Sequence, residues 1–254
     1  MGPFFCICNH IILWYNSYMN TRYTFLLADA DNTLFDFYAG EKLALRETFG
    51  VFDLPANDAA FATYHRINEA LWRRLERGEI SPGALHVQRF TELLDTLALS
   101  ESRSAADIAA FFIQALGRQA ILLPGAEQAV RRWASRAPVA IVTNGIAAVQ
   151  RARIAHSPIA DCFAALIISE EIGAPKPHRH MVDAALEALG CTDRRRALLL
   201  GDSLAADIAA AANAGIDSCW YNPKNAPNAT VHAPTYTVAS LDEVDALLFD
   251  REET

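Results

Sequence analysis

The chain has 254 residues with 22 basic and 30 acidic side chains, which gives a formal net charge of −8. This length can bury a sizeable core in one large domain or in two. No basic stripe is present, which excludes a binding surface for a nucleic-acid polymer. A small anionic substrate stays compatible with the charge if local cations offset the overall field.

The cysteines are few, odd in number and scattered: Cys6, Cys8, Cys162, Cys191 and Cys219. They argue against a disulfide framework and predict a reducing, cytoplasmic location. The spacing within Cys6–His10 matches none of the usual zinc patterns, so no zinc site is expected there.

Residues 1–20 are predicted to be an N-terminal extension. Pro3–Tyr15 is rich in apolar and aromatic residues, but it has no basic leader and no clear cleavage site. It is also shorter than the roughly 20 residues that cross a bilayer, so no membrane association is expected. Met19 is expected to be the natural start of translation, which N-terminal sequencing of the native protein would test.

The mostly apolar run Tyr23–Ala28 ends abruptly in Asp29-Ala30-Asp31-Asn32-Thr33. Such a run is typical of a buried parallel strand, here with acidic residues at its carboxyl end. Side chains alternate along a strand, so Asp29 and Asp31 can face the same side. Two neighbouring carboxylates repel each other, which indicates a compensating partner such as a metal ion.

Residues 39–119 are predicted to be a helical cap inserted after this first strand. A stretch of roughly 80 residues is too long for a simple loop in a compact domain. Apolar residues recur there at helical steps of three and four, as at Phe61, Tyr64, Leu71 and Leu75. Residues 21–38 and 120–254 are then assigned to an α/β catalytic core.

Strand and helix patterns alternate after Pro124, which predicts a Rossmann-like core with a parallel sheet and helices on both faces. Three more strand patterns lead into polar residues: Thr143-Asn144-Gly145, then Lys176 between two prolines, then Gly201-Asp202 with Asp207. Ligands of open α/β sheets bind at the carboxyl ends of the strands, so these residues are expected to gather at one edge.

The expected site is strongly negative, because Asp29, Asp31, Asp202 and Asp207 face a single lysine, Lys176. At about 4 Å and an effective dielectric constant near 20, each like-charged pair costs roughly 4 kcal/mol. A hard divalent cation offsets this repulsion, and Mg²⁺ prefers oxygen ligands. Mg²⁺ is therefore the predicted cofactor.

In this order, Asp-x-Asp-x-Thr, Thr-Asn-Gly, Lys-Pro and Gly-Asp-x-x-x-x-Asp resemble the motifs of the haloacid dehalogenase-like (HAD) superfamily of phosphatases. The chain is most similar to bacterial pyrimidine 5'-nucleotidases of that superfamily, which dephosphorylate nucleoside monophosphates and clear non-standard ones. The segments that carry this likeness are Asp29–Phe35, Asn68–Ile80, Val142–Ile146, Ile168–Pro177 and Cys219-Trp220. The resemblance extends from about Thr24 to Leu248.

The resemblance implies a role for each motif residue. Asp29 would attack phosphorus, and Asp31 would act as general acid and then as general base. Mg²⁺ would be held by the Asp29 side chain, the Asp31 backbone carbonyl and Asp202, with Asp207 in a supporting role. The substrate phosphate would be bound by Thr143, the backbone N–H groups of Asn144 and Gly145, and Lys176.

The function implied by the resemblance is that of a Mg²⁺-dependent phosphatase acting on nucleoside 5'-monophosphates through an aspartyl-phosphate. The alternative is a HAD phosphatase or mutase acting on another small phosphate ester, such as a sugar phosphate. Dehalogenases of the superfamily lack an acid at the Asp31 position, which disfavours that chemistry. A signalling receiver domain lacks a large insert after the first strand, and a non-catalytic binding protein has no support because every catalytic position is filled.

Each of these residues taken alone also has a structural explanation. A single Asp after a strand is more often a helix cap or turn residue, and Thr143-Asn144-Gly145 can be a simple turn. The histidines His178 and His180 are expected at the surface. On the cap, Trp72 is expected to be a core aromatic, whereas Asn68 and Arg89 could contact a base or a phosphate. Asn32 stands where these nucleotidases often carry Glu, a non-catalytic position.

Overall fold

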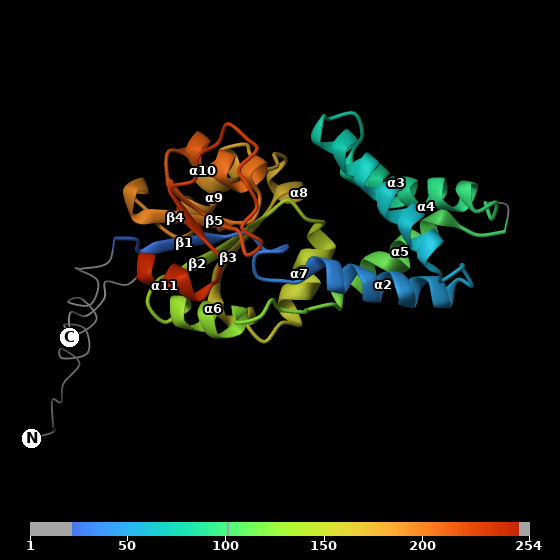
Figure 1. The fold of residues 1–254 in the computed structure, drawn as a ribbon, viewed down its shortest axis with the longest axis horizontal. Coiled ribbons are helices and arrows are strands. Elements are labelled where there is room, and N and C mark those ends of the chain that lie inside the picture. The colour runs from blue at the N-terminus through green and yellow to red at the C-terminus, as the bar shows by residue number, and fades with distance from the viewer. Residues whose placement is uncertain (1–21, 101, 249–254) are drawn as a thin grey trace, which may run out of the picture. The chain divides into compact units, whose positions relative to one another are not determined.

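A computed structural model describes residues 22–100 and 102–248 of the chain (Figure 1). The predicted extension, Cys6–His10 and Met19 lie outside these residues. The chain forms two compact units, which we call the α/β unit and the helical unit. Within the described residues, the α/β unit comprises 22–34, 122–144 and 161–248, and the helical unit comprises 35–121 and 145–160.

The α/β unit is built on a six-stranded sheet in the order β3-β2-β1-β4-β5-β6, and every neighbouring pair is parallel. The strands are β1 (Phe25–Ala28), β2 (Val139–Thr143), β3 (Phe163–Ile168), β4 (Ala197–Gly201), β5 (Asp217–Tyr221) and β6 (Tyr236–Val238). Strands β2 and β4 are buried along their whole length, because central parallel strands are covered on both faces. Strand β1 lies between them, with Leu27 opposite Ala140 and Leu199.

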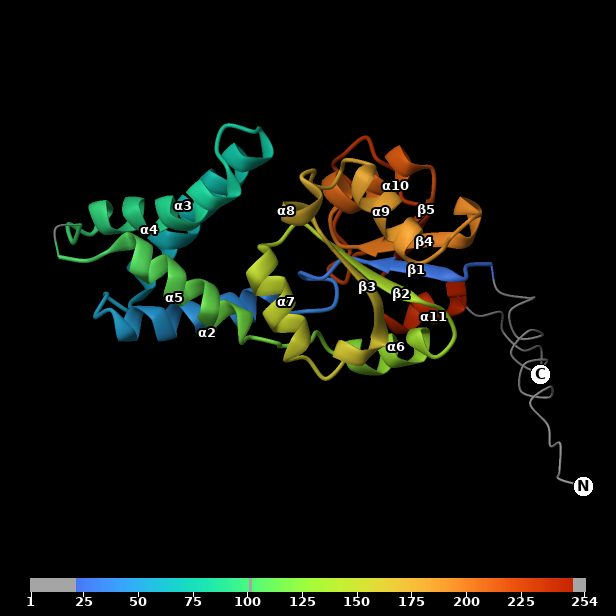
Figure 2. The ribbon, with the colours of Figure 1, turned by 180° about the vertical axis from the view of Figure 1, so that it is seen from behind.

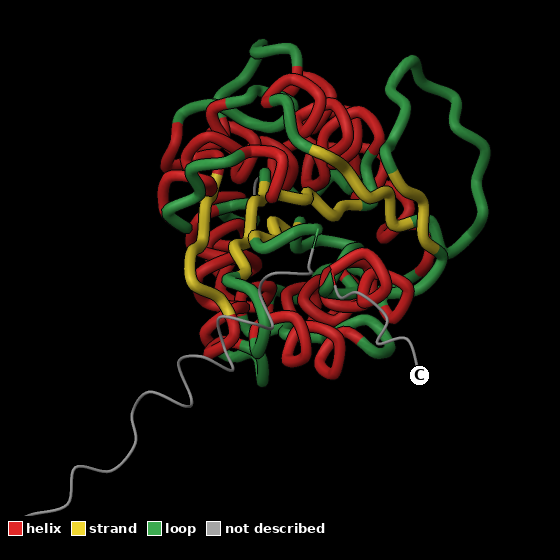
Figure 3. Tube along the Cα trace, turned by 90° about the vertical axis from the view of Figure 1, so that its left-hand side faces the viewer, coloured by secondary structure: helices red, strands yellow, loops and turns green. Residues whose placement is uncertain are grey.

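Helices cover both faces of this sheet (Figures 1 and 2). On one face, α9 (His180–Ala188) and α10 (Ala209–Ala214) pack buried apolar residues such as Met181 and Ala211 against Leu27 and Leu199. On the other face lie α6 (Ala126–Ala134) and α11 (Asp242–Leu248). They are joined by Asp245, which accepts hydrogen bonds from Arg132 and from the indole of Trp133, both at 2.7 Å. Figure 3 shows the strands in yellow among the red helices.

The helical unit contains α2 (Phe37–Val51), α3 (Asp58–Glu76), α4 (Pro82–Thr96) and α5 (Ala105–Gly117), which precede β2 in the chain, and α7 (Ala147–Ala155), which follows it. The first four helices begin at side-chain caps, because an Asp, Asn or Ser oxygen satisfies an otherwise unpaired N–H group. The capping residues are Asp36, Asn57, Ser81 and Ser104. Aromatic side chains fill the core between these helices, including Tyr64, Phe90 and Phe112.

The α/β fold with a parallel sheet and a helical insert after the first strand is confirmed. One segment differs from the sequence expectation, which assigned all of 120–254 to the α/β core. Residues 145–160 belong to the helical unit, where α7 packs closely on α5: a Cβ added to Gly117 would lie 3.0 Å from the Ala152 Cβ. The apolar pattern of α7 does not indicate which of the two units the helix belongs to.

Among the described residues, none of the helices has the combination of length and apolar character that spanning a membrane requires. The described cysteines Cys162, Cys191 and Cys219 are free thiols.

Candidate active site

The carboxyl edge of the sheet carries the polar residues that the strand patterns predicted. Asp29 directly follows β1, Thr143 ends β2, and Asp202 directly follows β4. Lys176 lies in the loop between α8 (Ser169–Ile172), which follows β3, and α9. Because all these strands run in the same direction, their polar ends share one edge of the α/β unit.

Lys176 is the centre of this group. Its ammonium Nζ forms ion pairs with Asp29 Oδ1 and Asp207 Oδ1, both at 2.6 Å, and it donates a hydrogen bond to the Val142 carbonyl at 2.6 Å. All three charged side chains are buried: Lys176 is 4% exposed, Asp29 6% and Asp207 1%. Lys176 therefore links a carboxylate that precedes it in the sequence to one that follows it, and all three charged groups are buried.

The position of Lys176 is fixed by its backbone. The Lys176 N–H donates to Asn144 Oδ1 at 2.7 Å, and Asn144 Nδ2 donates to the Lys176 carbonyl at 2.9 Å. This reciprocal pair attaches the lysine loop to the residue that follows β2. Only the backbone N–H of Asn144 was predicted to have a role, and this use of its amide side chain was not predicted.

Thr33 is a second connecting residue; it belongs to the Asp-x-Asp-x-Thr motif, but no role was predicted for it. Its hydroxyl donates to Asp29 Oδ2 at 3.2 Å and accepts from the Asp202 N–H at 3.1 Å, and the side chain is fully buried. Trp220 on β5 holds the same loop from the other side, with its indole N–H 2.9 Å from the Asp202 carbonyl. Asp29 and the loop that carries Asp202 are thus linked through one hydroxyl.

Asp207 is held by the turn on which it lies. A turn of π-helix, Leu204–Ile208, precedes α10, and the Ser203 N–H donates to Asp207 Oδ2 at 3.0 Å. The Asp207 side chain then passes directly over Gly201: a Cβ at that position would come within 2.2 Å of its Cγ. Only glycine leaves room for this approach, which explains the Gly-Asp pair at the end of β4.

The electrostatics show how concentrated the negative charge is. Burial raises the pKa of Asp29 to about 8; Lys176 opposes this rise, whereas Asp207, Asp202 and Asp31 add to it. Burial, together with Asp207, likewise raises the pKa of Asp202 to about 7. Burial acts to lower the pKa of Lys176, but Asp207 and Asp29 outweigh it and the pKa is raised. The lysine stays charged and leaves the carboxylates under-compensated.

These residues fit a divalent cation. One carboxylate oxygen from each of Asp29, Asp202 and Asp207 lies within 4.8 Å of the other two. An all-oxygen donor set with excess negative charge suits Mg²⁺, which binds through one or two carboxylates and keeps several waters. Asp207 therefore belongs to this cluster and also pairs with Lys176. The supporting role predicted for Asp207 did not specify that its carboxylate lies so close to those of Asp29 and Asp202.

The structure places the remaining predicted residues as follows. Asp31 is half-buried, two residues beyond Asp29, and contributes to the raised pKa of Asp29. Thr143 is 1% exposed at the end of β2. Gly145 is the first residue of the helical-unit segment 145–160, and a Cβ there would lie 2.1 Å from Gln150 Nε2. His178 and His180 are exposed, as expected. The catalytic and binding roles of all these residues stay predictions.

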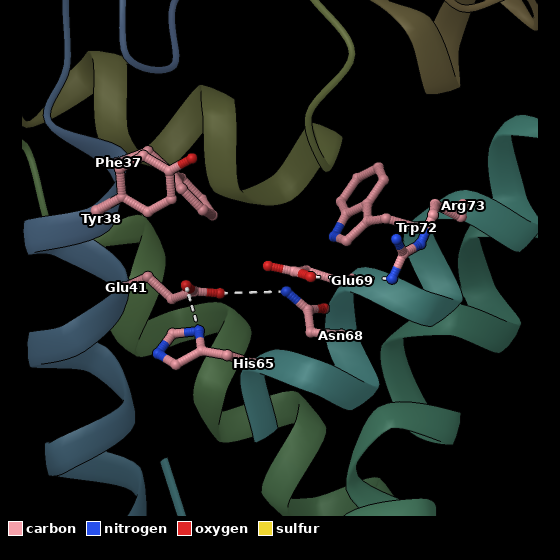
Figure 4. A pocket seen from close by; sticks show the side chains of 8 residues that line it. All are labelled: Phe37, Tyr38, Glu41, His65, Asn68, Glu69, Trp72 and Arg73. Atoms are coloured by element: carbon pink, nitrogen blue, oxygen red, sulfur yellow. Dashed lines mark hydrogen bonds and ion pairs between the residues drawn. The ribbon is translucent and has the colours of Figure 1, made fainter. Parts of the chain in front are cut away.

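The helical unit has a pocket of its own, of about 320 Å³ (Figure 4). It is lined by Phe37, Tyr38, Glu41, His65, Asn68, Glu69, Trp72 and Arg73. Trp72, expected to be a core aromatic, packs partly against the helical core and also lines this pocket. Asn68 is 7% exposed and reaches Arg89, which is 2% exposed.

Comparison with known proteins agrees with this architecture. The sequence profile of the haloacid dehalogenase-like hydrolases matches residues 25–215. Pyrimidine 5'-nucleotidase YjjG of Escherichia coli (strain K12) is 33% identical over 227 residues, which are 89% of this chain and 98% of that protein. Pyrimidine 5'-nucleotidase PynA of Streptococcus pneumoniae (strain ATCC BAA-255 / R6) is 34% identical over 226 residues, 87% of this chain and 93% of that protein.

A solved structure gives the same result. The magnesium-bound crystal structure of the HAD-hydrolase YfnB from Bacillus subtilis superposes with a TM-score of 0.82 at 32% identity, and the match covers 89% of this chain and 99% of that one. The profile match spans most of the chain, and two relatives above 30% identity cover nearly all of it. The chain therefore belongs to the haloacid dehalogenase-like hydrolase family.

Proposed function

We propose that the protein is a Mg²⁺-dependent phosphatase that hydrolyses nucleoside 5'-monophosphates, with Asp29 as the nucleophile. The observation that carries the proposal is the buried Asp29 carboxylate, bound by the Lys176 ammonium at 2.6 Å and by the Thr33 hydroxyl at 3.2 Å. Two nearly full-length relatives that are pyrimidine 5'-nucleotidases support the choice of a nucleotide substrate.

The reaction proceeds in two steps. A carboxylate oxygen of Asp29 forms a bond to phosphorus as the bond from phosphorus to the 5'-oxygen breaks, and Asp31 gives its proton to the departing oxygen. Asp31 then takes a proton from water, whose oxygen attacks phosphorus and releases Asp29 and orthophosphate. Lys176 offsets the charge of the nucleophile and of the phosphoryl group throughout.

The chain's residues also supply the binding site for the phosphate and the metal. Asp29, Asp202 and the Asp31 backbone would hold Mg²⁺, with Asp207 adjacent. When bound, the ion supplies positive charge against the phosphoryl oxygens and reduces repulsion among the carboxylates. Thr143, with the backbone N–H groups of the two residues after it, would bind the non-bridging phosphate oxygens. The reducing, cytoplasmic location expected from the cysteines stays a prediction.

The direct test is hydrolysis of p-nitrophenyl phosphate, with Mg²⁺ and with a chelator, followed by a panel of nucleoside monophosphates and sugar phosphates. We expect Mg²⁺-dependent turnover and a preference for nucleotides. Preference for sugar phosphates would instead support the alternative substrate class. Asp29→Asn is expected to abolish turnover without unfolding the protein, and retained activity would refute its role as the nucleophile. Asp31→Asn is expected to accumulate phospho-enzyme, detectable by intact mass.

A further inference from the structure

Asp202 differs from Asp29 and Asp207, the other two members of the carboxylate cluster, in how its side chain is supported. The Asp29 carboxylate accepts hydrogen bonds from Lys176 and Thr33. The Asp207 carboxylate pairs with Lys176 and accepts a hydrogen bond from a backbone N–H. Asp202 is half-buried, and no side chain of another described residue donates a hydrogen bond to its carboxylate. The direction of this carboxylate therefore depends on the backbone of Asp202.

The backbone of Asp202 is held on both sides by side chains. Strand β4 ends at Gly201, and buried backbone groups beyond the end of a strand need partners from elsewhere. The Asp202 N–H donates to Thr33 Oγ1 at 3.1 Å, and the Asp202 carbonyl accepts from the Trp220 indole N–H at 2.9 Å. Because peptide groups are planar, these two contacts restrain the backbone before and after the Cα atom. They thereby restrain the direction in which the side chain leaves the backbone.

Trp220 is suited to give rigid support. It lies on β5, beside β4 in the sheet (Figure 1), and is paired in register with Gly201, the residue before Asp202. Trp220 is 8% exposed, so the surrounding residues limit the movement of its ring. The only polar group of the indole is an N–H, which can donate but not accept. A phenylalanine would fill much of the same space without a donor, so the hydrogen bond is the specific contribution of tryptophan here.

Trp133 shows what a buried indole does in the same unit when it serves stability alone. Trp133 on α6 is fully buried, and its indole N–H donates to Asp245 on α11 at 2.7 Å. That contact joins two helices and involves no residue of the candidate active site. Trp220 makes the same kind of bond to a residue whose carboxylate has an oxygen within 4.8 Å of those of Asp29 and Asp207. The partner of Trp220, rather than its burial, therefore indicates a function.

We propose that Trp220 is a positioning residue for the metal site: by holding the Asp202 backbone, it keeps the Asp202 carboxylate close to those of Asp29 and Asp207 before Mg²⁺ binds. The inference rests on the proposed function. A ligand that is oriented in advance needs less ordering when the ion binds, and this raises the affinity. Groups that orient a metal ligand without touching the ion typically contribute about tenfold to a hundredfold to the affinity.

The test is the Mg²⁺ affinity of the metal-free protein, measured by isothermal titration calorimetry. Trp220→Phe keeps an aromatic ring and removes the N–H donor, and it is expected to raise the Kd for Mg²⁺ about tenfold to a hundredfold. The Mg²⁺ concentration that half-saturates turnover of p-nitrophenyl phosphate should rise by the same factor. At saturating Mg²⁺, kcat and the KM for the ester should change less than about threefold, which separates a positioning role from a general loss of structure.

Trp133→Phe is the matched control, because it removes a buried indole hydrogen bond in the same unit. Both variants should lower the melting temperature, but Trp133→Phe should leave the Kd for Mg²⁺ within about twofold of that of the unmodified protein. An unchanged Kd in Trp220→Phe, or an equal rise in both variants, would overturn the inference and leave the phosphatase proposal intact. Absence of both Mg²⁺ binding and turnover in the unmodified protein would instead refute the proposed function.

A second measurement covers the case in which Trp220→Phe fails to fold, which thermal unfolding would reveal. The indole N–H of Trp220 gives its own NMR signal in the unmodified protein, identified by elimination with Trp14→Phe, Trp72→Phe and Trp133→Phe. Because the acceptor of this N–H is the carbonyl of a proposed metal ligand, Mg²⁺ should shift the Trp220 signal and leave the Trp133 signal in place. A Trp220 signal that does not move when Mg²⁺ binds would overturn the inference.

Discussion

Replacing Lys176 by Met removes the charge at the centre of the site and keeps a side chain of similar length. The ammonium lies 2.6 Å from both Asp29 and Asp207, and the lysine is 4% exposed. Without it, two buried carboxyl groups face each other with no cation between them. Burial already raises the pKa of Asp29 to about 8, so the charge that loses its partner is that of the second carboxylate, and the folded variant takes up one more proton than the unmodified protein does.

The size of the effect follows from that proton. The pKa of an ordinary Asp carboxyl is 3.8. If the folded protein keeps such a group neutral, the free energy of unfolding falls by about 1.4 kcal/mol for each pH unit above that value. One additional neutral carboxyl therefore lowers the free energy of unfolding by about 4 kcal/mol near pH 7 and by about 2 kcal/mol near pH 5. The upper figure agrees with the ~3–5 kcal/mol lost when a buried ion pair is broken by removing one partner.

Urea unfolding of the metal-free protein at both pH values measures this directly. Lys224→Met, in an exposed loop, is the matched control and should change the free energy of unfolding by less than about 0.5 kcal/mol. Turnover of p-nitrophenyl phosphate by Lys176→Met should fall at least about 10²-fold. A destabilisation that is the same at both pH values, or below about 1 kcal/mol, would refute the assignment of Lys176 as the counter-charge of this carboxylate pair.

Other parts of the site give further predictions. Thr33→Val leaves the Asp202 N–H without its buried acceptor, so urea unfolding should show a loss of about 1–3 kcal/mol; an unchanged midpoint would contradict the bridging role. Gly201→Ala places a Cβ 2.2 Å from the Asp207 Cγ and should reduce both stability and turnover, whereas Gly83→Ala, with nothing within 4 Å, should reduce neither. The pKa of Asp202 is raised from 3.8 to about 7, so between these pH values the folded metal-free protein holds a proton that the unfolded chain releases. The stability that comes from this proton is lost as the pH rises from 3.8 to about 7. Mg²⁺ must displace this proton, so it should raise the melting temperature more at about pH 8 than at about pH 5.5; calorimetry showing the reverse order would refute the assignment of Asp202 to the metal site.

The residues at the sheet edge were predictable because each strand there is an apolar run that ends in polar residues. An apolar run ending in Asp29 or in Gly201-Asp202 has one plausible location in an α/β protein, and the order of the motifs identified the family. The long helical insert was equally visible, because nothing between residues 39 and 119 alternates with the period of a strand.

Features that depend on distant parts of the chain were not predictable in the same way. The Asn144 amide pairs with the backbone of a residue 32 positions away, and the Asp202 N–H reaches Thr33 across 169 positions. No local pattern encodes such partners. Helix α7 was assigned to the wrong unit for a related reason, since its apolar residues would suit either core. The π-helical turn Leu204–Ile208, where Asp207 accepts from the Ser203 N–H, was not predicted either.

The central place of β1 in the sheet has a consequence for synthesis of the protein. Its hydrogen-bonding neighbours, β2 and β4, are translated more than a hundred residues later, and the Asp29–Lys176 contact spans 147 positions. A nascent chain therefore carries an apolar strand without its pairing partners until β4 has left the ribosome, and an unpaired apolar strand favours aggregation during that interval.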